Sequence, residues 1–510
     1  MAAFAKEDMR RAPAPESLTP REPGEPLRAL AEVMANQSAE PAYSPVVIAG
    51  VVRFLDFFSV CAAGAGVFWF YLHPFPQEGM FGYLVMLPAV AAVSVIVFQA
   101  LGINRIGAFR APLYQGFRLA GGFALVFLGA LAIVFFLKLD GVFSRVWMLG
   151  WFSAGIAALF IERAIVSMFV RHLTRAGRLD RRTVVVGGGA DAEQLLEDLA
   201  RQKDTDLRIY GVFDDRSDSR TPDVIGGYPK LGNVDDLVEF ARHARIDLAI
   251  FAMPITAEQR LLEMLRKLWV LPIDIRLAAH ANKLRFRPRS YSYIGNVPVF
   301  DVFDKPIADW DVVMKSAFDR IVGALCLVAL SPVLLITAIA VKLDSKGPVI
   351  FRQKRYGFNN ELIEVFKFRS MYTEQLDPAA AKLVTRDDPR VTRVGRFIRR
   401  TSIDELPQLF NVVFKGNLSL VGPRPHAVHA KAADRQYDEV VDGYFARHRV
   451  RPGITGWAQV NGWRGETDTP EKLQHRVEHD LFYIENWSLL LDLYILAITP
   501  FALIKAENAY

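Results

Sequence analysis

The sequence predicts a multi-domain membrane protein with three folded parts: a four-helix transmembrane bundle, an α/β domain, and a second α/β module with a helix embedded in the membrane. Apolar residues make up 52% of the 510 residues and charged residues 23%, which is too apolar for an ordinary soluble enzyme. Four long apolar stretches follow one another in the first third of the chain. After them, β-rich runs alternate with amphipathic helical patterns, the order of an α/β fold.

Net charge and cysteine content exclude other classes of protein. Lys and Arg total 61 and Asp and Glu total 55, and an excess of only +6 argues against a protein that packages nucleic acid. We therefore expect no nucleic-acid partner. The two cysteines, Cys61 and Cys326, lie in apolar runs, which excludes a disulfide framework and a thiolate zinc site.

Residues 1–43 are expected to form a disordered cytoplasmic tail. No apolar periodicity develops there, so the segment cannot bury enough surface to offset its ordering entropy. It also lacks a charged region followed at once by an apolar one, so we do not expect a secretory signal. Its prolines are Pro13, Pro15, Pro20, Pro23, Pro26 and Pro41.

Residues 44–172 are expected to form the four-helix transmembrane region. The four stretches are each long enough to cross ~30 Å of hydrocarbon; they are Val46–Leu72, Met80–Ile103, Gly116–Leu137 and Phe143–Val170. Buried helices of a large soluble core are the alternative, but little polar surface separates the stretches. Arginines follow the second and fourth spans, so the positive-inside rule places both ends of the region in the cytoplasm. Asp56 and Glu162 are expected to face the bundle interior.

A glycine-rich turn marks the next domain. Thr183–Val186 has the pattern of a buried parallel strand, Gly187-Gly188-Gly189 follows directly, and the next strand ends in Asp214-Asp215. This is the order of a βαβ unit, in which glycines let the backbone approach a phosphate and acids lie near a ribose. We expect a doubly wound, Rossmann-like domain over residues 180–300. Because many such domains carry no cofactor, we favour a structural or regulatory role, and nucleotide binding stays open.

A fifth apolar stretch opens the last part of the chain, residues 309–510. It spans Ala317–Val341 and is broken at Ser331-Pro332. A fifth transmembrane span would carry the following basic residues outside, against the positive-inside rule. Proline and serine at mid-depth instead favour a kink. We therefore expect a re-entrant helix over residues 315–343 that dips into the inner leaflet and returns.

The region that follows gathers cations around one pair of carboxylates. The carboxylates are Asp404 and Glu405, and the cations include Lys354, Arg355, Lys367, Arg369, Arg399, Arg400 and Arg424. One guanidinium group can bind two phosphate oxygens at once, so a high density of arginine and lysine suits a pyrophosphate substrate. Such a substrate would repel carboxylates, which predicts that one of them holds a divalent metal.

Each of these features has a simpler explanation when taken alone. Ser402 could cap a helix start, with Glu405 at its third position reaching back to the cap. The basic run could be a solvated face that rests on anionic lipid.

Together, the motifs resemble a known family. From about Lys315 onward the chain is similar to the polyprenyl-phosphate phosphoglycosyl transferases, bacterial enzymes that begin exopolysaccharide and O-antigen synthesis. The motifs that carry the resemblance are Ser331-Pro332, Lys354–Gly357, Phe366–Met371, Arg399–Gln408, Ser419–Pro425 and Arg451–Trp457. The order of four spans, Rossmann-like domain and α/β catalytic module resembles the large monotopic members of the family.

The resemblance implies a reaction. In that family the aspartate of the Asp-Glu pair, here Asp404, attacks the β-phosphate of a UDP-sugar and expels UMP. Undecaprenyl phosphate then takes the phosphosugar, and Glu405 matches the family's Mg²⁺ ligand. By analogy, the substrate-binding residues are Lys354, Arg355, Lys367, Arg369, Arg399, Arg400 and Arg424, with Arg449, Arg451, Gln459 and Asn461 as candidates for uridine or sugar contacts.

The resemblance also bears on sugar, location and partners. The loop Gly462–Thr469 resembles members that transfer glucose 1-phosphate more than those that use galactose 1-phosphate, which stays the alternative. We expect the catalytic domain on the cytoplasmic face of the bacterial inner membrane, in contact with the lipid bilayer, and a homodimer. The apolar segment 487–504 is expected to lie at the interface.

Two rival functions remain at this point. The first is a membrane-anchored, NAD-dependent enzyme that modifies nucleotide sugars, but no Tyr-x-x-x-Lys pair follows the glycine-rich turn. The second is a non-enzymatic scaffold for polysaccharide assembly, in which the carboxylate pair only caps a helix.

Overall fold

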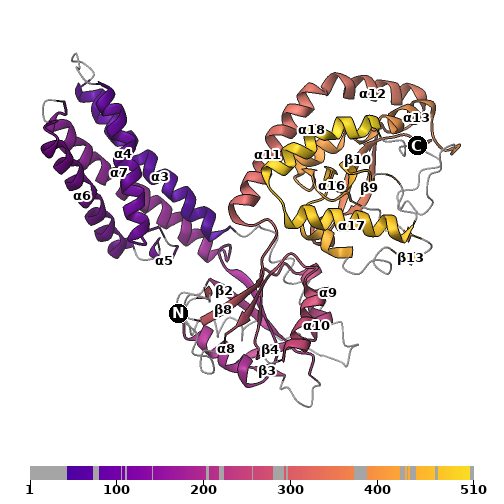
Figure 1. Cartoon of the computed structure of the whole chain (residues 1–510), viewed down its shortest axis with the longest axis horizontal. Coiled ribbons are helices and arrows are strands. Elements are labelled where there is room, and N and C mark those ends of the chain that lie inside the picture. Colours follow the sequence, from indigo (N-terminus) through magenta and orange to yellow (C-terminus); the bar gives the residue numbers. More distant parts are fainter. Residues whose placement is uncertain are drawn as a thin grey trace. The chain divides into compact units, whose positions relative to one another are not determined.

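A computed structural model of the chain is shown in Figure 1. It describes residues 43–72, 80–104, 106–109, 112–139, 142–202, 206–216, 223–254, 257–279, 292–294, 297–372, 388–425, 431–432, 435–436, 444–463, 465 and 469–505. The expected tail therefore lies outside the described residues, except for Tyr43. The chain divides into two compact units, one that ends at Arg181 and one that begins at Arg182.

The first unit is helical. Its elements are α3 (Pro45–Val67), the π-helical turn η1 (Phe68–Leu72), α4 (Met80–Ala100), α5 (Ile106–Phe109), α6 (Pro112–Phe136) and α7 (Arg145–Arg175). By length and composition, four stretches could each cross a membrane: 45–72, 80–100, 115–136 and 145–175. This confirms the four apolar helices that the sequence predicts. The last one continues to Arg175, beyond the expected limit of Val170.

Aromatic side chains hold the bundle together. Trp147 and Trp151 of α7 are fully buried and donate their indole N–H groups to carbonyls of α3, at 3.0 Å to Gly64 and 2.8 Å to Val60. Gly64 permits this approach, because a Cβ there would lie 2.6 Å from the Trp151 ring. Buried tryptophan thus satisfies its polar atom and fixes the α3–α7 contact.

A polar cluster lies inside the bundle. Arg163 donates to both oxygens of Asp56, at 2.6 and 2.8 Å, and Asn104 also bonds to Asp56. Glu162 accepts a hydrogen bond of 2.7 Å from Ser59. Asp56 is fully buried and Glu162 is 9% exposed, so both acids face the interior as expected.

The second unit begins with an eight-stranded sheet in the order β3-β4-β2-β1-β5-β6-β8-β7. The strands are β1 (Arg181–Val186), β2 (Leu207–Phe213), β3 (Val224–Ile225), β4 (Tyr228–Gly232), β5 (Leu248–Phe251), β6 (Asp274–Ala278), β7 (Ser292–Ile294) and β8 (Val297–Phe303). β1, β5 and β6 pair in parallel, whereas β8 runs antiparallel to β6. The sheet is therefore mixed, and the sequence patterns missed β3, β4, β7 and β8.

Helices cover both faces of this sheet, as a doubly wound domain requires. Val184 and Val186 of β1 share a core with α9 (Val234–His243) and α10 (Glu258–Leu268). Val185 points to the opposite face and packs with α8 (Ala190–Ala200). Successive strand residues alternate between faces, which explains why β1 reads as a continuous apolar run.

The glycine-rich turn after β1 has a structural reason. Gly187 and Gly189 have positive φ angles of 107° and 86°, and a Cβ on Gly187 would lie 3.0 Å from the carbonyl oxygen of Ala252. The acids expected near a ribose are engaged in loop bonds. Asp215 accepts from the backbone N–H of Val234 at the start of α9, and Asp214 accepts from that of Arg216.

The rest of the second unit is the α/β module. Its main elements are α11 (Asp309–Ala329), α12 (Ser331–Asp344), β9 (Ile350–Tyr356), β10 (Leu362–Phe368), α13 (Arg393–Arg400), η6 (Ile403–Glu405), α14 (Gln408–Phe410), η7 (Asn411–Lys415), β11 (Ser419–Val421), η8 (Tyr444–Arg449), β14 (Gly453–Thr455), α16 (Trp457–Val460), α17 (Pro470–Glu485) and α18 (Leu489–Lys505). Its core joins β10 and β11 to apolar residues of α11, α17 and α18.

The chain bends sharply between α11 and α12. The two helices meet at 62° across Leu330, and the pair runs along the outer edge of the module in Figure 1. Pro332 lies in the first turn of α12, where its missing N–H costs nothing, and Ser331 donates to the carbonyl oxygen of Val328 at 2.7 Å. The Ser-Pro break predicted from the sequence is thus the point of the bend.

Candidate active site

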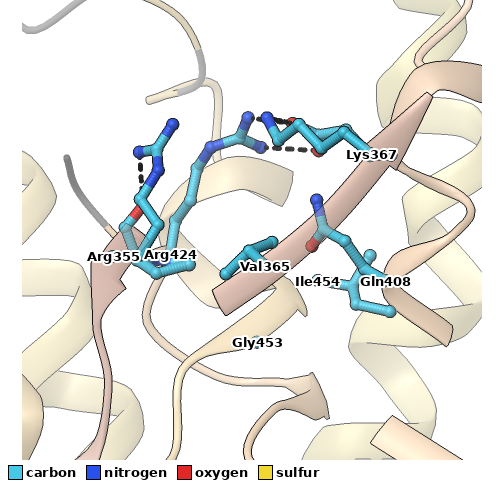
Figure 2. Close-up of a pocket in the computed structure, with 9 residues that line it drawn as sticks. Arg355, Val365, Lys367, Gln408, Arg424, Gly453 and Ile454 are labelled. Carbon is cyan, nitrogen blue, oxygen red and sulfur yellow. Dashed lines mark hydrogen bonds and ion pairs between the residues drawn. The ribbon is translucent and has the colours of Figure 1, made fainter. Parts of the chain in front are cut away.

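A pocket lies beside the β9–β10 hairpin (Figure 2). It is lined by Arg355, Val365, Lys367, Glu405, Gln408, Arg424, Pro425, Gly453 and Ile454. These residues come from the hairpin, the turn η6, the start of α14, the loop after β11, and β14. Charged side chains are concentrated at the pocket, and apolar ones form its floor.

The register of the hairpin decides which cations reach the pocket. Arg355 pairs with Ile363, and Lys367 pairs with Phe351. Side chains alternate along a strand and opposite residues share a face, so Arg355 and Lys367 point the same way. Lys354 pairs with Glu364, is exposed and faces the other side of the hairpin. The structure therefore brings Arg355 and Lys367 into the pocket but not Lys354.

The carboxylate pair lies on a single 3₁₀ turn, η6, and not at a helix start. Ser402, immediately before it, has a φ of 58°, a conformation that few residues other than glycine adopt, and its side chain makes no capping bond. The simpler explanation of Ser402 as an N-cap therefore does not hold. In a 3₁₀ turn successive side chains diverge by about 120°, so Asp404 and Glu405 face different directions.

Two cations hold Glu405. Lys367 Nζ lies 2.8 Å from Glu405 Oε1, and the guanidinium of Arg424 bonds to both carboxylate oxygens, at 2.6 and 3.2 Å. Figure 2 shows Lys367 and Arg424 converging, one from β10 and one from the loop after β11. Glu405 is 13% exposed, so these ion pairs are shielded from bulk water. Burial lowers the pKa of Lys367, while Glu405 and Asp404 oppose this shift.

Asp404 has a raised pKa. Loss of hydration comes first among the causes and the charge of Glu405 second, and together they raise the pKa of Asp404 to about 6. Lys367, Arg399 and Arg424 act in the opposite direction. The surroundings of Asp404 therefore favour its charged form less than water does.

Backbone contacts fix the loop that carries Arg424. Arg447 is 1% exposed, pairs with Asp480, and donates at 3.0 Å to the carbonyl oxygen of Arg424. Gly422 and Gly453 lie so close that a Cβ on Gly453 would be 2.1 Å from the Gly422 nitrogen. Only glycine permits this approach.

Some of the predicted residues lie elsewhere. Arg369 is 1% exposed and donates to the carbonyl oxygens of Val341, Ser345 and Pro348, so it caps the end of α12 and does not face a phosphate. Arg399 is near enough to lower the pKa of Asp404 without lining the pocket. Arg400 is exposed on α13.

The candidates for uridine or sugar contacts do not line this pocket. Arg449 donates to the carbonyl oxygen of Asp304, and Arg451 is exposed. Asn461 bonds to the carbonyl oxygen of Trp457 within α16. Gln459 Oε1 is buried without a hydrogen-bond partner in the described structure. These four assignments stay predictions.

Sequence patterns did not single out Gln408, Gln353 or Arg447. Gln408 ends one of the sequence motifs, but the sequence assigned no function to it. In the structure it lines the pocket. Gln353 accepts from Arg355 at 2.7 Å and orients that guanidinium. Arg447 is followed by His448 and Arg449, and nothing in the sequence distinguishes a buried arginine from exposed ones.

The donor set fits a divalent cation only in combination with substrate. Among the described residues, no three His, Cys, Asp or Glu side chains gather into a metal site. Mg²⁺ is commonly held by one or two carboxylates together with substrate phosphates and water. Glu405 can supply such a carboxylate, and a cation bound there would also offset the repulsion between Glu405 and Asp404.

The fold and the site define a class of protein. A membrane-associated module in which lysine and arginine surround a carboxylate pair is suited to transferring a phosphorylated group. The sequence model of the bacterial sugar transferase family matches residues 310–506, which include the whole pocket. A second family model, described as a CoA-binding domain, matches residues 99–279.

Relatives extend this match over most of the chain. The undecaprenyl-phosphate glucose phosphotransferase of Komagataeibacter xylinus is 41% identical over 379 residues, 72% of this chain and 68% of the relative. The UDP-glucose:undecaprenyl-phosphate glucose-1-phosphate transferase of Escherichia coli K12 is 37% identical over 437 residues, 84% of this chain and 91% of the relative. The chain therefore belongs to the family of bacterial sugar transferases.

A third relative covers the last part alone. The UDP-N-acetylgalactosamine-undecaprenyl-phosphate N-acetylgalactosaminephosphotransferase of Aeromonas hydrophila is 43% identical over 183 residues, 36% of this chain and 41% of the relative. Similar modules thus occur in proteins named for different sugars.

Arg369→Met should destabilise the protein without acting on the pocket. One buried and two partly buried carbonyl groups would lose their donor, and each buried unsatisfied group costs about 1–3 kcal/mol. We expect the variant to unfold at a lower temperature than the parent in detergent. Arg400→Met, whose side chain is exposed on α13, should unfold near the parent temperature. Equal losses in both variants would contradict the assignment of Arg369 to the end of α12.

Proposed function

We propose that this protein transfers glucose 1-phosphate from UDP-glucose to undecaprenyl phosphate and releases UMP. The observation that carries the proposal is the carboxylate pair, with Glu405 held by Lys367 and Arg424 and Asp404 beside it. The printed names of the relatives from Komagataeibacter xylinus and Escherichia coli K12 support the same donor and acceptor.

The first step uses Asp404 as the nucleophile. An oxygen of its carboxylate attacks the β-phosphorus of the UDP-sugar, and the bond from that phosphorus to the oxygen bridging the two phosphates breaks. The electron pair stays on that oxygen, and UMP departs as an anion. The guanidinium groups of Arg355 and Arg424 and the ammonium of Lys367 are placed to stabilise this charge.

The second step releases the enzyme. An oxygen of undecaprenyl phosphate attacks the phosphorus of the aspartyl-phosphosugar, the bond to Asp404 breaks, and the carboxylate is restored. The product is undecaprenyl-diphosphate glucose. Two displacements through one carboxylate replace a direct reaction between two anionic substrates.

Glu405 would hold Mg²⁺ against the diphosphate, while Asp404 faces another direction and attacks the phosphorus. When bound, the cation neutralises charge on the phosphate oxygens and on the departing UMP. Lys367 and Arg424 keep the Glu405 carboxylate oriented before substrate arrives.

The bent pair α11–α12 is proposed to be a re-entrant helix that enters the cytoplasmic leaflet of the bacterial inner membrane. Its apolar side chains are exposed, among them Leu325, Val328, Leu335, Ile336 and Leu343. The lipid acceptor has its phosphate at headgroup level, so a shallow insertion holds the pocket at the depth of the reacting phosphate. The four apolar helices would anchor the same face, and the middle domain would have a structural or regulatory role.

Asp404→Asn should abolish the reaction. The amide cannot act as a nucleophile, so UMP release should fall at least about 1,000-fold. The measurement is UMP release by protein in nanodiscs with undecaprenyl phosphate, Mg²⁺ and a panel of UDP-sugars. Asp311→Asn, on the exposed first turn of α11, is the matched control.

The same assay tests the sugar and the intermediate. We expect UDP-glucose to be preferred over UDP-galactose. Without undecaprenyl phosphate, each active site should release about one UMP, because the aspartyl-phosphosugar forms once and accumulates without an acceptor. Normal turnover by Asp404→Asn would reject the mechanism, and no release from any UDP-sugar would reject the function.

Removal of divalent metal should stop UMP release, and added Mg²⁺ should restore it. Because Glu405 is a proposed ligand, Glu405→Gln should raise the Mg²⁺ concentration needed for half-maximal rate about 10-fold or more. Glu361→Gln, whose side chain is exposed on the hairpin turn, is the control. An unchanged Mg²⁺ requirement in Glu405→Gln would remove that residue from the metal site.

Cysteine labelling tests on which side of the membrane the residues beyond the bend lie. In a background without Cys61 and Cys326, Lys346→Cys beyond the bend and Arg201→Cys in the middle domain should both react from the cytoplasmic side. Adding Pro332→Ala should favour a straight helix and shift Lys346→Cys to the opposite side in part of the population. If Lys346→Cys in the protein that keeps Pro332 reacted only from the outside of the membrane, α11 and α12 would form a true transmembrane span.

A further inference from the structure

A second cluster of charges is buried outside the pocket. Lys315 of α11, Tyr483 of α17 and Asp492 of α18 have exposed fractions of 7%, 1% and 0%. Lys315 Nζ lies 2.6 Å from Asp492 Oδ2 and 3.2 Å from Asp319 Oδ1. The Tyr483 hydroxyl, which has one proton, lies within hydrogen-bond distance of two acceptors, Asp492 Oδ1 at 2.8 Å and the Val421 carbonyl oxygen at 3.0 Å. The cluster thus joins three helices of the module.

The cluster converges on one backbone atom, the carbonyl oxygen of Val421. Lys315 Nζ and the Tyr483 hydroxyl each lie 3.0 Å from it, and Ser419 Oγ lies 2.8 Å away. Asp319 holds the preceding residue, because it accepts from the backbone N–H of Leu420. Donors on two helices and on β11 itself therefore define the position of this peptide group.

Val421 is three residues before Arg424, the cation that bonds to Glu405. Between them, the Gly422 N–H donates to the carbonyl oxygen of Thr455, and the Pro423 carbonyl accepts from Gly453. Each peptide from Val421 to Arg424 is thus tied to a neighbouring element. The cluster is the point at which α11 and α18, the apolar helices of the module, hold this loop.

Desolvation makes such a cluster costly. Removing one ammonium and two carboxylates from water takes several kcal/mol per ion, and apolar side chains would pack three helices without that cost. Charged groups with fixed hydrogen bonds do provide defined geometry at the Val421 carbonyl. Catalysis is sensitive to such geometry, since a misplacement of about 1 Å costs on the order of 100-fold in rate.

We propose that Lys315, Tyr483 and Asp492 are positioning residues, which hold the Val421 carbonyl so that Arg424 meets Glu405. The cluster would then link the membrane-facing helices to the phosphate-binding side of the pocket. The predicted effect of these residues on the rate of UMP release rests on the proposed function. Their predicted effect on the placement of Arg424 does not, because that placement can be measured without turnover.

The first test reads that placement directly. Tyr483→Phe removes one donor to Val421 and leaves every charge in place, so we expect this variant to fold. Lys315→Met is not used, because it would leave two buried carboxylates without their cation. Phenylglyoxal modification of Arg424, followed by mass spectrometry on the full chain in nanodiscs, should become several-fold faster in Tyr483→Phe. Thr499→Val removes a partly buried hydroxyl of α18 that bonds to Thr455 and not to Val421, and should leave the rate unchanged. An unchanged Arg424 rate in Tyr483→Phe would overturn the proposal.

The second test is a double-mutant cycle on UMP release. Tyr483→Phe should lower kcat about 10-fold, and in an Arg424→Gln background it should cause little further loss, since the group that it positions is gone. Additive losses would show a general structural role and overturn the proposal. Failure of the parent protein to release UMP would instead reject the proposed function, while the modification rates would still decide the position of Arg424.

Discussion

The site depends on one interaction, the carboxylate of Glu405 held between Lys367 and Arg424. The two cations come from segments far apart in the sequence, a hairpin strand and the loop after β11, so the module must be folded before the carboxylate has its partners. Asp404, on the same short turn, lacks a comparable ion pair in the described structure and has a raised pKa. Adjacent residues thus acquire different chemistry from different surroundings, the usual way that carboxylate pairs divide their roles.

The rest of the module serves to keep that arrangement rigid. Buried arginine and lysine bond to backbone carbonyls at four places in the described part of the module: Arg369 at the end of α12, Arg447 at Arg424, Lys315 at Val421, and Arg476 at Trp463 and Gly465. The carbonyl oxygens of a buried loop lack the backbone partners that a helix or sheet provides. A buried cation that donates to such an oxygen supplies the missing hydrogen bond. In this module, several basic residues thus support loops.

That use of arginine explains which parts of the structure could be predicted from the sequence. The length of the four apolar stretches and the Ser-Pro break predict the four apolar helices and the bend, because hydropathy is a property of a whole segment. Composition marks Lys354, Arg355, Lys367 and Arg369 alike as basic. Strand register separates Lys354 from Arg355, and only packing reveals that Arg369 caps a helix. Likewise, the short strands β3 and β7 form through pairing that no local pattern shows.

The pocket also indicates where sugar selectivity cannot lie. Its charged residues are suited to phosphates, which every nucleotide diphosphate sugar carries, and a relative named for N-acetylgalactosamine is 43% identical over 183 residues of this part. A hydroxyl or acetamido group is distinguished by a few hydrogen bonds, which guanidinium and ammonium groups around a diphosphate do not supply. Hydrogen-bonding side chains other than these cations are therefore needed to distinguish one sugar from another.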